Sequence, residues 1–327
     1  MRRLWLNNGL FNMKLENIDN LEETINNAVD MKDVFKDCLV DLKKELPPID
    51  TIVYVGTDYK GRKVSAITRF ECSCIYAPSK AKKSFAKSLL EAAYIGGETS
   101  RYTKHFVGTN RKERYIISLD TEQGEFYAQR SFRRVATMVG ADYPKYIPLQ
   151  LRKKSVKDRL ALIRWIVYES PYAGKIDLIT IDGLADLVTN TNDIELATEL
   201  AEEMMKWTAE GLHVCFILHK NGGSQKARGH IGTVSTIKAE TLISIDHITD
   251  DSGNITEKNT VRISCSHSRG IYFEDFYLTV NEDGLPFTHD DPQDNVFKTI
   301  EEKKALPFID PKDAFGVDEG KDNGVAF

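Results

Sequence analysis

Short apolar segments alternate with amphipathic ones along the middle of this chain, and this alternation limits the possible folds more than any other feature. The segments 70–76, 114–119, 176–181 and 213–218 are short and apolar, as buried strands are. Helical periodicity follows at 84–95, 125–139 and 194–210, and between Ser155 and Pro171. This order predicts an α/β fold with a parallel sheet covered by helices on both faces. Ligands of such sheets bind at the carboxyl ends of the strands.

The region before this core has two patterns. Apolar residues fall near helical spacing from Leu21 to Leu46, and Pro47-Pro48 ends the pattern, so residues 1–50 are expected to form an N-terminal helical appendage. The segments 51–56 and 63–68 are apolar and β-branched, and a turn-forming sequence joins them. They predict a β-hairpin at the start of the core.

The region after the core changes again. Beyond Ala239 the segments 240–248, 260–267 and 273–280 predict a C-terminal antiparallel β-meander, so the core spans residues 51–281. Residues 282–327 are rich in Pro, Asp, Lys and Gly, and we expect a flexible tail there.

Composition limits the class of protein. Hydrophobic residues make up 41% and charged residues 28%, an ordinary globular balance. The net charge of -5 excludes a wholly basic nucleic-acid coat but leaves room for a local basic loop. We found no pattern of a signal peptide or a membrane span, so a cytoplasmic location and no membrane partner are expected.

Cysteine and tryptophan residues are expected in the core. The five cysteines lack the spacing of a zinc site or a disulfide framework, which predicts free thiols. Cys72 and Cys74 alternate with apolar residues and are expected at buried strand positions. Trp165 and Trp207 lie on apolar helix stripes and are also expected inside.

The junction of the first core strand and helix carries a phosphate-binding pattern. Its spacing is that of the P-loop, G-x-x-x-x-G-K-S/T, in which Lys83 would reach the β- and γ-phosphates of ATP and Ser84 would bind Mg²⁺. Ala77 and Lys82 replace the two glycines, and a basic helix start is the alternative interpretation. The candidate nucleotide-binding residues are Ala77, Pro78, Ser79, Lys80, Ala81, Lys82, Lys83 and Ser84.

Two further strand ends carry acids. Asp182 ends an apolar run and could hold the Mg²⁺ shell, partly through water, although it could also cap a turn with Gly183. Asp120 and Glu122 follow another strand, where a glutamate can orient or deprotonate the attacking water. Solvated acids are the alternative. Phosphate, metal and base chemistry at three strand ends together favour an ATPase.

The order of these motifs resembles that of a known family. After Asp182 come Ile217-Leu218-His219-Lys220-Asn221 and then Ala227-Arg228-Gly229-His230. From about Thr51 to Ile248 the chain is similar to RecA-like ATPases related to RepA and DnaB helicases, in particular those of bacterial mobile elements and phages. The resemblance implies a RecA-like sheet, Glu122 as catalytic glutamate, Asp182 as the Walker B residue and His219 as a polar sensor.

The segment from His219 to Gly232 predicts a flexible, basic, glycine-rich loop. Lys220, Lys226 and Arg228 could contact nucleic-acid phosphates, or reach the γ-phosphate bound by a neighbouring subunit. A plain solvated loop is the alternative. Arg228 is the first candidate for an arginine finger, which would make it catalytic with Lys83, Glu122 and His219, and Lys238 is the second.

These observations predict an ATP- and Mg²⁺-dependent nucleic-acid motor or loader. An arginine finger supplied by a neighbour requires a head-to-tail homo-oligomer, of which a hexameric ring is one form, and single-stranded DNA is the expected partner. A degenerate P-loop scaffold without efficient hydrolysis is the alternative, supported by Lys82 and opposed by Glu122 with Asp182. Helicase, recombinase and loader all stay open, as do DNA and RNA.

Overall fold

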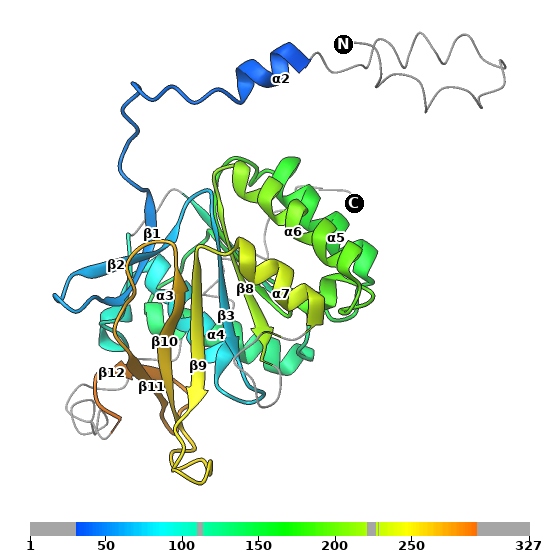
Figure 1. The fold of residues 1–327 in the computed structure, drawn as a ribbon. Coiled ribbons are helices and arrows are strands. Elements are labelled where there is room, and N and C mark those ends of the chain that lie inside the picture. Colours follow the sequence, from blue (N-terminus) through cyan, green and yellow to red (C-terminus); the bar gives the residue numbers. More distant parts are fainter. Residues whose placement is uncertain (1–30, 110–113, 221–226, 228, 293–327) are drawn as a thin grey trace. The chain divides into compact units, whose positions relative to one another are not determined.

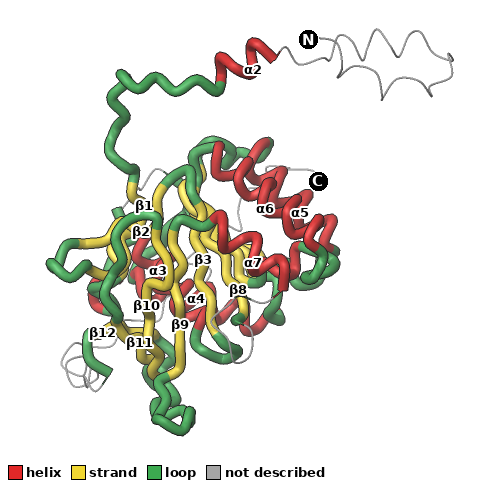
Figure 2. The backbone as a smooth tube through the Cα atoms, viewed as in Figure 1, coloured by secondary structure: helices red, strands yellow, loops and turns green. Residues whose placement is uncertain are grey.

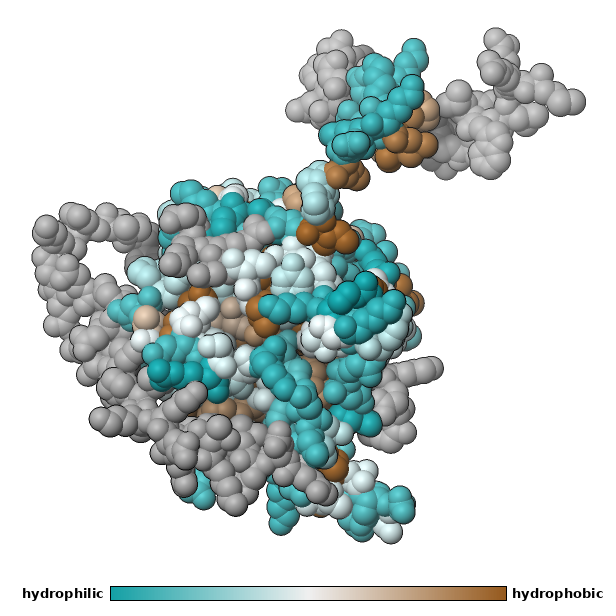
Figure 3. Space-filling model, turned by 90° about the vertical axis from the view of Figure 1, so that its left-hand side faces the viewer, coloured by the Kyte–Doolittle hydropathy of each residue, from teal (hydrophilic) through white to brown (hydrophobic). Residues whose placement is uncertain are grey.

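The computed structural model describes residues 31–109, 114–220, 227 and 229–292. The chain divides into two units, Met1–Pro48 and Ile49–Phe327. In the first unit, helix α2 (Met31–Asp37) buries none of its residues, and residues 38–48 are not helical. The predicted helix is therefore wrong between Asp37 and Leu46, and its part before residue 31 lies outside the described residues. A helix of two turns without a packed face is marginal in water. Hydrophobic (brown) residues stay on the surface of this segment (Figure 3).

A nine-stranded sheet forms the centre of the second unit (Figure 1). Its order is β12-β11-β10-β9-β3-β8-β7-β5-β6. The strands from β9 to β6 in this order are parallel, and those from β9 to β12 pair antiparallel. The predicted α/β class and C-terminal β-meander are confirmed. The strands are β3 (Cys72–Ala77), β5 (Tyr115–Asp120), β6 (Tyr146–Gln150), β7 (Ile176–Asp182), β8 (His213–His219), β9 (Thr241–His247), β10 (Thr260–Ser268), β11 (Phe276–Val280) and β12 (Pro286–His289).

Helices cover both faces of the parallel part, as predicted (Figure 2). On β3, Cys72, Cys74 and Tyr76 belong to the hydrophobic cluster under α5, α6 and α7, whereas Ile75 and Ala77 belong to the cluster under α3 and α4. This alternation along a strand buries both faces of the sheet. The helices are α3 (Lys83–Ile95), α4 (Glu125–Val139), α5 (Val156–Tyr168), α6 (Ile194–Ala209) and α7 (Gly229–Lys238), with short 3₁₀ turns η1 (Thr99–Arg101) and η2 (Leu184–Leu187).

A second, three-stranded sheet packs beside α3. Strands β1 (Thr51–Thr57) and β2 (Lys63–Thr68) form the predicted hairpin, and β4 (Phe106–Gly108) pairs with the other edge of β1. Strand β4 was not predicted. It contacts α3 so closely that a Cβ on Gly108 would lie 2.0 Å from the Ala93 carbonyl oxygen. Only glycine permits this approach.

Two strands of the large sheet escaped the sequence analysis for one reason. Strand β6 contains Pro148 and β12 begins with Pro286, and both are edge strands. Proline interrupts a strand pattern in the sequence, yet an edge strand tolerates it because one side of its backbone needs no ladder hydrogen bond. The predicted tail is therefore wrong at 286–289, while residues 293–327 lie outside the described residues.

Other predictions have mixed outcomes. Helix α4 begins and ends at the predicted residues, whereas the first turn of α7, residues 229–232, was assigned to the glycine-rich loop. Trp207 is fully buried as predicted, but Trp165 is 45% exposed, so its prediction is wrong. All cysteines are free thiols, and Cys72 and Cys74 are buried. In the part of the chain that the structure describes, every helix is too short or too polar to span a bilayer.

Candidate active site

The strand ends that carry the predicted site residues are neighbours in the sheet. In the parallel registers Ala77 lies opposite His219, and Asp182 lies opposite both Asp120 and Ile217. Helix α3 starts directly after the loop that leaves β3. The site therefore gathers at the carboxyl edge of β3, β8, β7 and β5, where parallel sheets bind ligands.

The loop between β3 and α3 has an unusual backbone. Lys80 and Lys82 both have positive φ, at 63° and 61°. This conformation costs a residue other than glycine about 1–2 kcal/mol. Lys82 thus adopts the left-handed conformation that a glycine of the P-loop pattern would adopt without cost. Strain of this kind is retained where neighbouring backbone N–H groups form an anion-binding concavity.

Helix α3 also begins without a side-chain cap and without an acid in its first turn. By contrast, Ser155 caps α5 and Asp193 caps α6 through side-chain oxygens. The first amides of a helix have no partner inside the helix, and they carry a partial positive charge. The start of α3 can therefore donate to the oxygens of an anion such as phosphate.

Lys83, the first residue of α3, points its ammonium group into the site. Its Nζ lies 2.9 Å from His219 Nδ1 and 3.5 Å from the Pro78 carbonyl oxygen. Burial lowers the pKa of Lys83, and the carboxylates of Glu122 and Asp182 oppose that shift. An ammonium group has only donors, so Nδ1 accepts and a neutral His219 ring carries its proton on Nε2.

Ser84 and Asp182 form a pair that fits Mg²⁺. Ser84 Oγ donates to Asp182 Oδ2 at 2.9 Å, and Asp182 is buried. Burial raises the pKa of Asp182 to about 6, whereas Lys87 opposes the shift. No cluster of three or more His, Cys, Asp or Glu side chains that could hold a metal occurs among the described residues. Mg²⁺ needs none, because it keeps several waters and takes one or two carboxylates together with phosphate oxygens.

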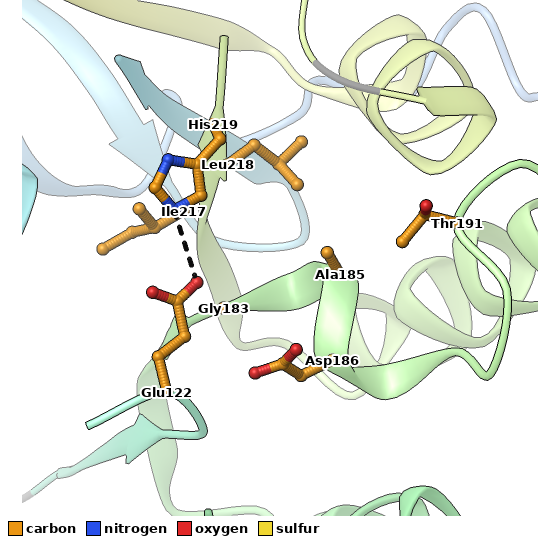
Figure 4. Close-up of a pocket in the computed structure, with 8 residues that line it drawn as sticks. All are labelled: Glu122, Gly183, Ala185, Asp186, Thr191, Ile217, Leu218 and His219. Carbon is orange, nitrogen blue, oxygen red and sulfur yellow. Dashed lines mark ion pairs between the residues drawn. The ribbon is translucent and has the colours of Figure 1, made fainter. Parts of the chain in front are cut away.

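Glu122 and His219 lie next to each other at one side of a pocket of about 300 Å³ (Figure 4). Glu122 Oε1 lies 3.7 Å from His219 Nε2, and each side chain is 39% exposed. The interaction with His219 lowers the pKa of Glu122 despite partial burial. Glu122 is therefore an ionised, accessible base. The pocket is lined by Glu122, Gly183, Ala185, Asp186, Thr191, Ile217, Leu218 and His219.

Two residues that the sequence analysis did not assign to catalysis hold the Glu122 loop. Asp120 is fully buried and accepts hydrogen bonds from the backbone amides of Glu122, at 3.1 Å, and Gln123, at 2.8 Å. The alternative of a solvated acid is wrong for Asp120. Gly183 has a φ of 100°, and a Cβ there would lie 2.2 Å from Thr121 Oγ1 and 2.8 Å from Glu122 Cγ. The pair Asp182-Gly183 was the available signal for this close approach.

Lys87 is a third residue that was missed. It lies one turn after Lys83, is 1% exposed, and its Nζ is 3.5 Å from Glu91 Oε1. Glu91 in turn accepts from Ser118 Oγ at 2.6 Å and from the Tyr146 hydroxyl at 3.0 Å. This buried ion pair places a cation beneath the acids at the ends of β5 and β7. A lysine four residues after Lys83 on an apolar helix face was its only signal in the sequence.

The predicted nucleic-acid loop is only partly described. Lys226 and Arg228 lie outside the described residues. Lys220 is buried, and its Nζ donates to Ser244 Oγ at 2.6 Å and pairs with Asp246 Oδ1 at 2.5 Å. The prediction that Lys220 contacts phosphates is therefore corrected, because its charge is already neutralised inside the fold and ties the end of β8 to β9.

Comparison with known proteins adds no assignment. The sequence matches no protein-family model, and a search of curated proteins found no match. The geometry of the site is thus the basis for its chemistry.

Proposed function

We propose that this protein is a RecA-like ATPase that hydrolyses Mg-ATP at the carboxyl edge of its parallel sheet. The observation that carries the proposal is the convergence of five predicted residues on one place: Lys83, Ser84, Glu122, Asp182 and His219. Each supplies a group that phosphoryl transfer to water needs: phosphate binding, metal binding, a base or its partner. The uncapped start of α3 adds the amide donors.

The residues divide the reaction between them. The α3 amides and Lys83 would bind the β- and γ-phosphates, and Lys83 would exchange His219 Nδ1 for a phosphate oxygen. Ser84 and Asp182 would hold Mg²⁺, which neutralises charge on the phosphates when bound. Glu122 would accept the proton of the water that attacks the γ-phosphorus, while the bond to the β–γ bridging oxygen breaks. His219, through Nε2, would keep the Glu122 carboxylate in place.

Lys82, which stands where the P-loop pattern has its second glycine, gives only weak support to the alternative of a scaffold that does not hydrolyse ATP. Its positive φ gives the loop the backbone path of a glycine, and its Nζ lies 5.8 Å over the Phe85 ring. The substitution therefore keeps a glycine-like backbone conformation at this position. This supports nucleotide binding, and Glu122 beside the pocket supports hydrolysis.

We propose further that hydrolysis drives a nucleic-acid motor or loader of the helicase, recombinase or loader type, acting on single-stranded DNA as a head-to-tail homo-oligomer such as a hexameric ring. Arg228 is the candidate that would reach a neighbour's nucleotide. Asp182 and His219 end neighbouring strands and Glu122 follows the end of the next strand, β5, which supports a RecA-like arrangement.

Nucleotide binding tests the site directly. Lys83→Ala should abolish binding of Mg-ATP, measured by calorimetry, because it removes the ammonium group that meets the phosphates. Lys63→Ala is the matched control, since it removes an exposed lysine outside this loop and should bind ATP as the wild type does. Equal affinity of Lys83→Ala and the control would refute the assignment of the loop.

Mixing variants tests the shared site. Arg228→Ala alone should bind ATP but should not turn it over. Mixed with Lys83→Ala subunits it should regain part of the turnover, because one interface then pairs an intact Lys83 with an intact Arg228. No recovery at any ratio, in mixtures shown by native mass spectrometry to co-assemble, would exclude Arg228 as a residue acting on the neighbour's nucleotide.

A further inference from the structure

A pair of exposed aromatic rings stands beside the candidate site and has no part in its chemistry. Phe126 is 70% exposed and Tyr127 is 63% exposed, both in the first turn of α4. Their ring centroids lie 5.4 Å apart with the planes at 85°. Rings this exposed bury little apolar area on folding and contribute little to the core, so the pair is available for contact with a partner.

Basic side chains lie near the start of α4, where this pair stands. Strands β5 and β6 run parallel with Asp120 opposite Gln150, so the segments that follow them emerge side by side. Arg152 Nη1 lies 3.3 Å from the position that a Cβ on Gly124 would take, and Lys153 Nζ lies 3.8 Å from Glu125 Oε2. The exposed basic residues of this surface are Arg130, one turn after Phe126, and Arg152, Lys153, Lys154 and Lys157.

We propose that this aromatic–basic surface, formed by Phe126, Tyr127, Arg152, Lys153 and Lys154, binds single-stranded nucleic acid. Aromatic rings at the surface stack on unpaired bases of any sequence, and nearby arginine and lysine side chains attract the phosphates between those bases. A duplex hides the faces of its bases, so exposed rings favour a single strand. Lys220 is buried against Asp246 and is not available to phosphates, so this surface would supply the positive charge for nucleic-acid binding instead.

The position of the surface gives it a route to the site. Glu122 and Glu125 bracket the turn that enters α4, and Gln150 Nε2 donates to the Gln123 carbonyl oxygen at 2.8 Å. A strand bound to Phe126 and Arg152 would therefore lie against the end of the Glu122 loop that leads into α4. The inference rests on the proposed function for the identity of its partner, but binding at this surface needs no hydrolysis.

The test is fluorescence anisotropy of a labelled oligothymidylate of about 20 nucleotides, without ATP. The double variant Phe126→Ala/Tyr127→Ala should weaken binding by roughly tenfold or more for each ring that stacks. Phe126→Leu/Tyr127→Leu should weaken it similarly, because leucine keeps the apolar surface but cannot stack. Trp165→Ala/Tyr168→Ala removes two other exposed rings and should bind as the wild type does.

Charge is tested by salt dependence. The triple variant Arg152→Ala/Lys153→Ala/Lys154→Ala should lower the slope of log affinity against log salt by roughly 2 if all three side chains meet phosphates of a single strand. The control Lys60→Ala/Lys63→Ala/Lys175→Ala removes the same charge from exposed positions elsewhere and should keep the slope. A ribonucleotide strand of the same length distinguishes RNA from DNA as the preferred source of the bases.

Four results would overturn the proposal. Oligonucleotide binding by the aromatic double variants at wild-type strength would remove the rings from the interface. Loss of self-association with unchanged oligonucleotide binding would make the surface a subunit contact, and loss of ATP affinity alone would assign the rings to the nucleotide. ATP turnover without nucleic acid is measured on the same proteins. A wild type that turns over ATP but binds no oligonucleotide would refute this inference and leave the proposed ATPase activity unaffected.

Discussion

Strand β8 begins and ends with a histidine beside a glutamate, and the two ends differ in burial and in the direction of the glutamate pKa shift. At its start, His213 is fully buried; Nδ1 donates to the Thr68 carbonyl oxygen at 2.6 Å, and Nε2 accepts from Ser73 Oγ at 2.8 Å. Glu240 Oε1 lies 3.7 Å from Nδ1. At its end, His219 is 39% exposed and lies between Lys83 and Glu122.

The difference separates a structural cluster from a reactive one. Both ring nitrogens of His213 have partners inside the fold, and burial lowers its pKa to about 4, so the ring stays neutral and inert. Burial likewise raises the pKa of Glu240 to about 7. At the other end the pKa of Glu122 is lowered and its carboxylate opens to a pocket. Residue types are alike at both ends. Exposure and the opposite directions of the glutamate pKa shifts distinguish the candidate site from the buried cluster.

At the exposed end of β8, Glu122→Gln should give the largest loss of ATP turnover. The amide keeps the shape of the side chain but removes the basic oxygen, so ATP should still bind while turnover falls by roughly 10²–10⁴-fold. Phosphate release at saturating Mg-ATP with single-stranded DNA measures it. Glu125→Gln is the matched control, because Glu125 is exposed three residues away and contacts only the exposed Lys153 among the ion pairs described. Equal turnover of the wild type and Glu122→Gln would remove Glu122 from the mechanism.

At the buried end of β8, His213→Leu should give the largest loss of unfolding free energy. It leaves the Thr68 carbonyl and the Ser73 hydroxyl buried without their partner, which should lower the free energy of unfolding by roughly 3 kcal/mol. His219→Leu should change that free energy by about 1 kcal/mol or less but should lower ATP turnover. Urea titrations and phosphate release on both variants measure the contrast. If His219→Leu were the more destabilising variant, the distinction between the two ends would fail.

The pH dependence of stability sharpens the same contrast. The folded-state pKa of Glu240 is raised from 4.5 to about 7, so it contributes stability that is complete below pH 4.5 and lost as the pH rises to 7. That of His213 is lowered from 6.5 to about 4, so its contribution is present above pH 6.5 and lost as the pH falls to 4. The two trends oppose each other between pH 4.5 and 6.5.

Glu240→Gln should therefore unmask the His213 trend. Relative to the wild type, the variant should gain roughly 3 kcal/mol of unfolding free energy between pH 4.5 and 7.5, because it has no buried carboxyl group to ionise. Urea titrations at several pH values measure this gain. The control is Glu98→Gln, which alters a glutamate that pairs with Arg101 and is distant in sequence from Glu240. Its unfolding free energy should vary with pH as that of the wild type does. A constant difference between Glu240→Gln and the wild type would contradict the raised pKa of Glu240.

Lys82→Gly should give the smallest effect. Glycine adopts a φ of 61° without cost, so the variant should gain about 1 kcal/mol of unfolding free energy and keep its affinity for ATP. Lys206→Gly is the control of opposite sign, because Lys206 lies exposed within α6 and glycine there should lose about 1 kcal/mol. Thermal unfolding measures both. A destabilised Lys82→Gly would show that the lysine side chain, not its backbone, matters in this loop.

Elements with a strong local pattern were predictable. Helix α4 and strands β7 and β8 agree with their predictions to within a residue, because their apolar periodicity is long and uninterrupted. Strands β6 and β12 were not predictable, since Pro148 and Pro286 hide edge strands that only neighbouring strands stabilise. Helix α7 begins in a glycine-rich stretch, and its Gly232 lies against Ala227 in a contact that no local pattern reveals.

The sequence by itself determined the α/β class, the alternation of strands and helices, and the residue types of the site, because these depend on periodicity and on spacing along a short segment. Only the tertiary structure decided which polar residues are available for chemistry. Lys220 forms an ion pair with Asp246, and His213 forms hydrogen bonds with Thr68 and Ser73. Glu122, by contrast, faces a pocket. Partners such as Asp246 and Thr68 come from distant strands, and burial and pKa depend on all of them at once.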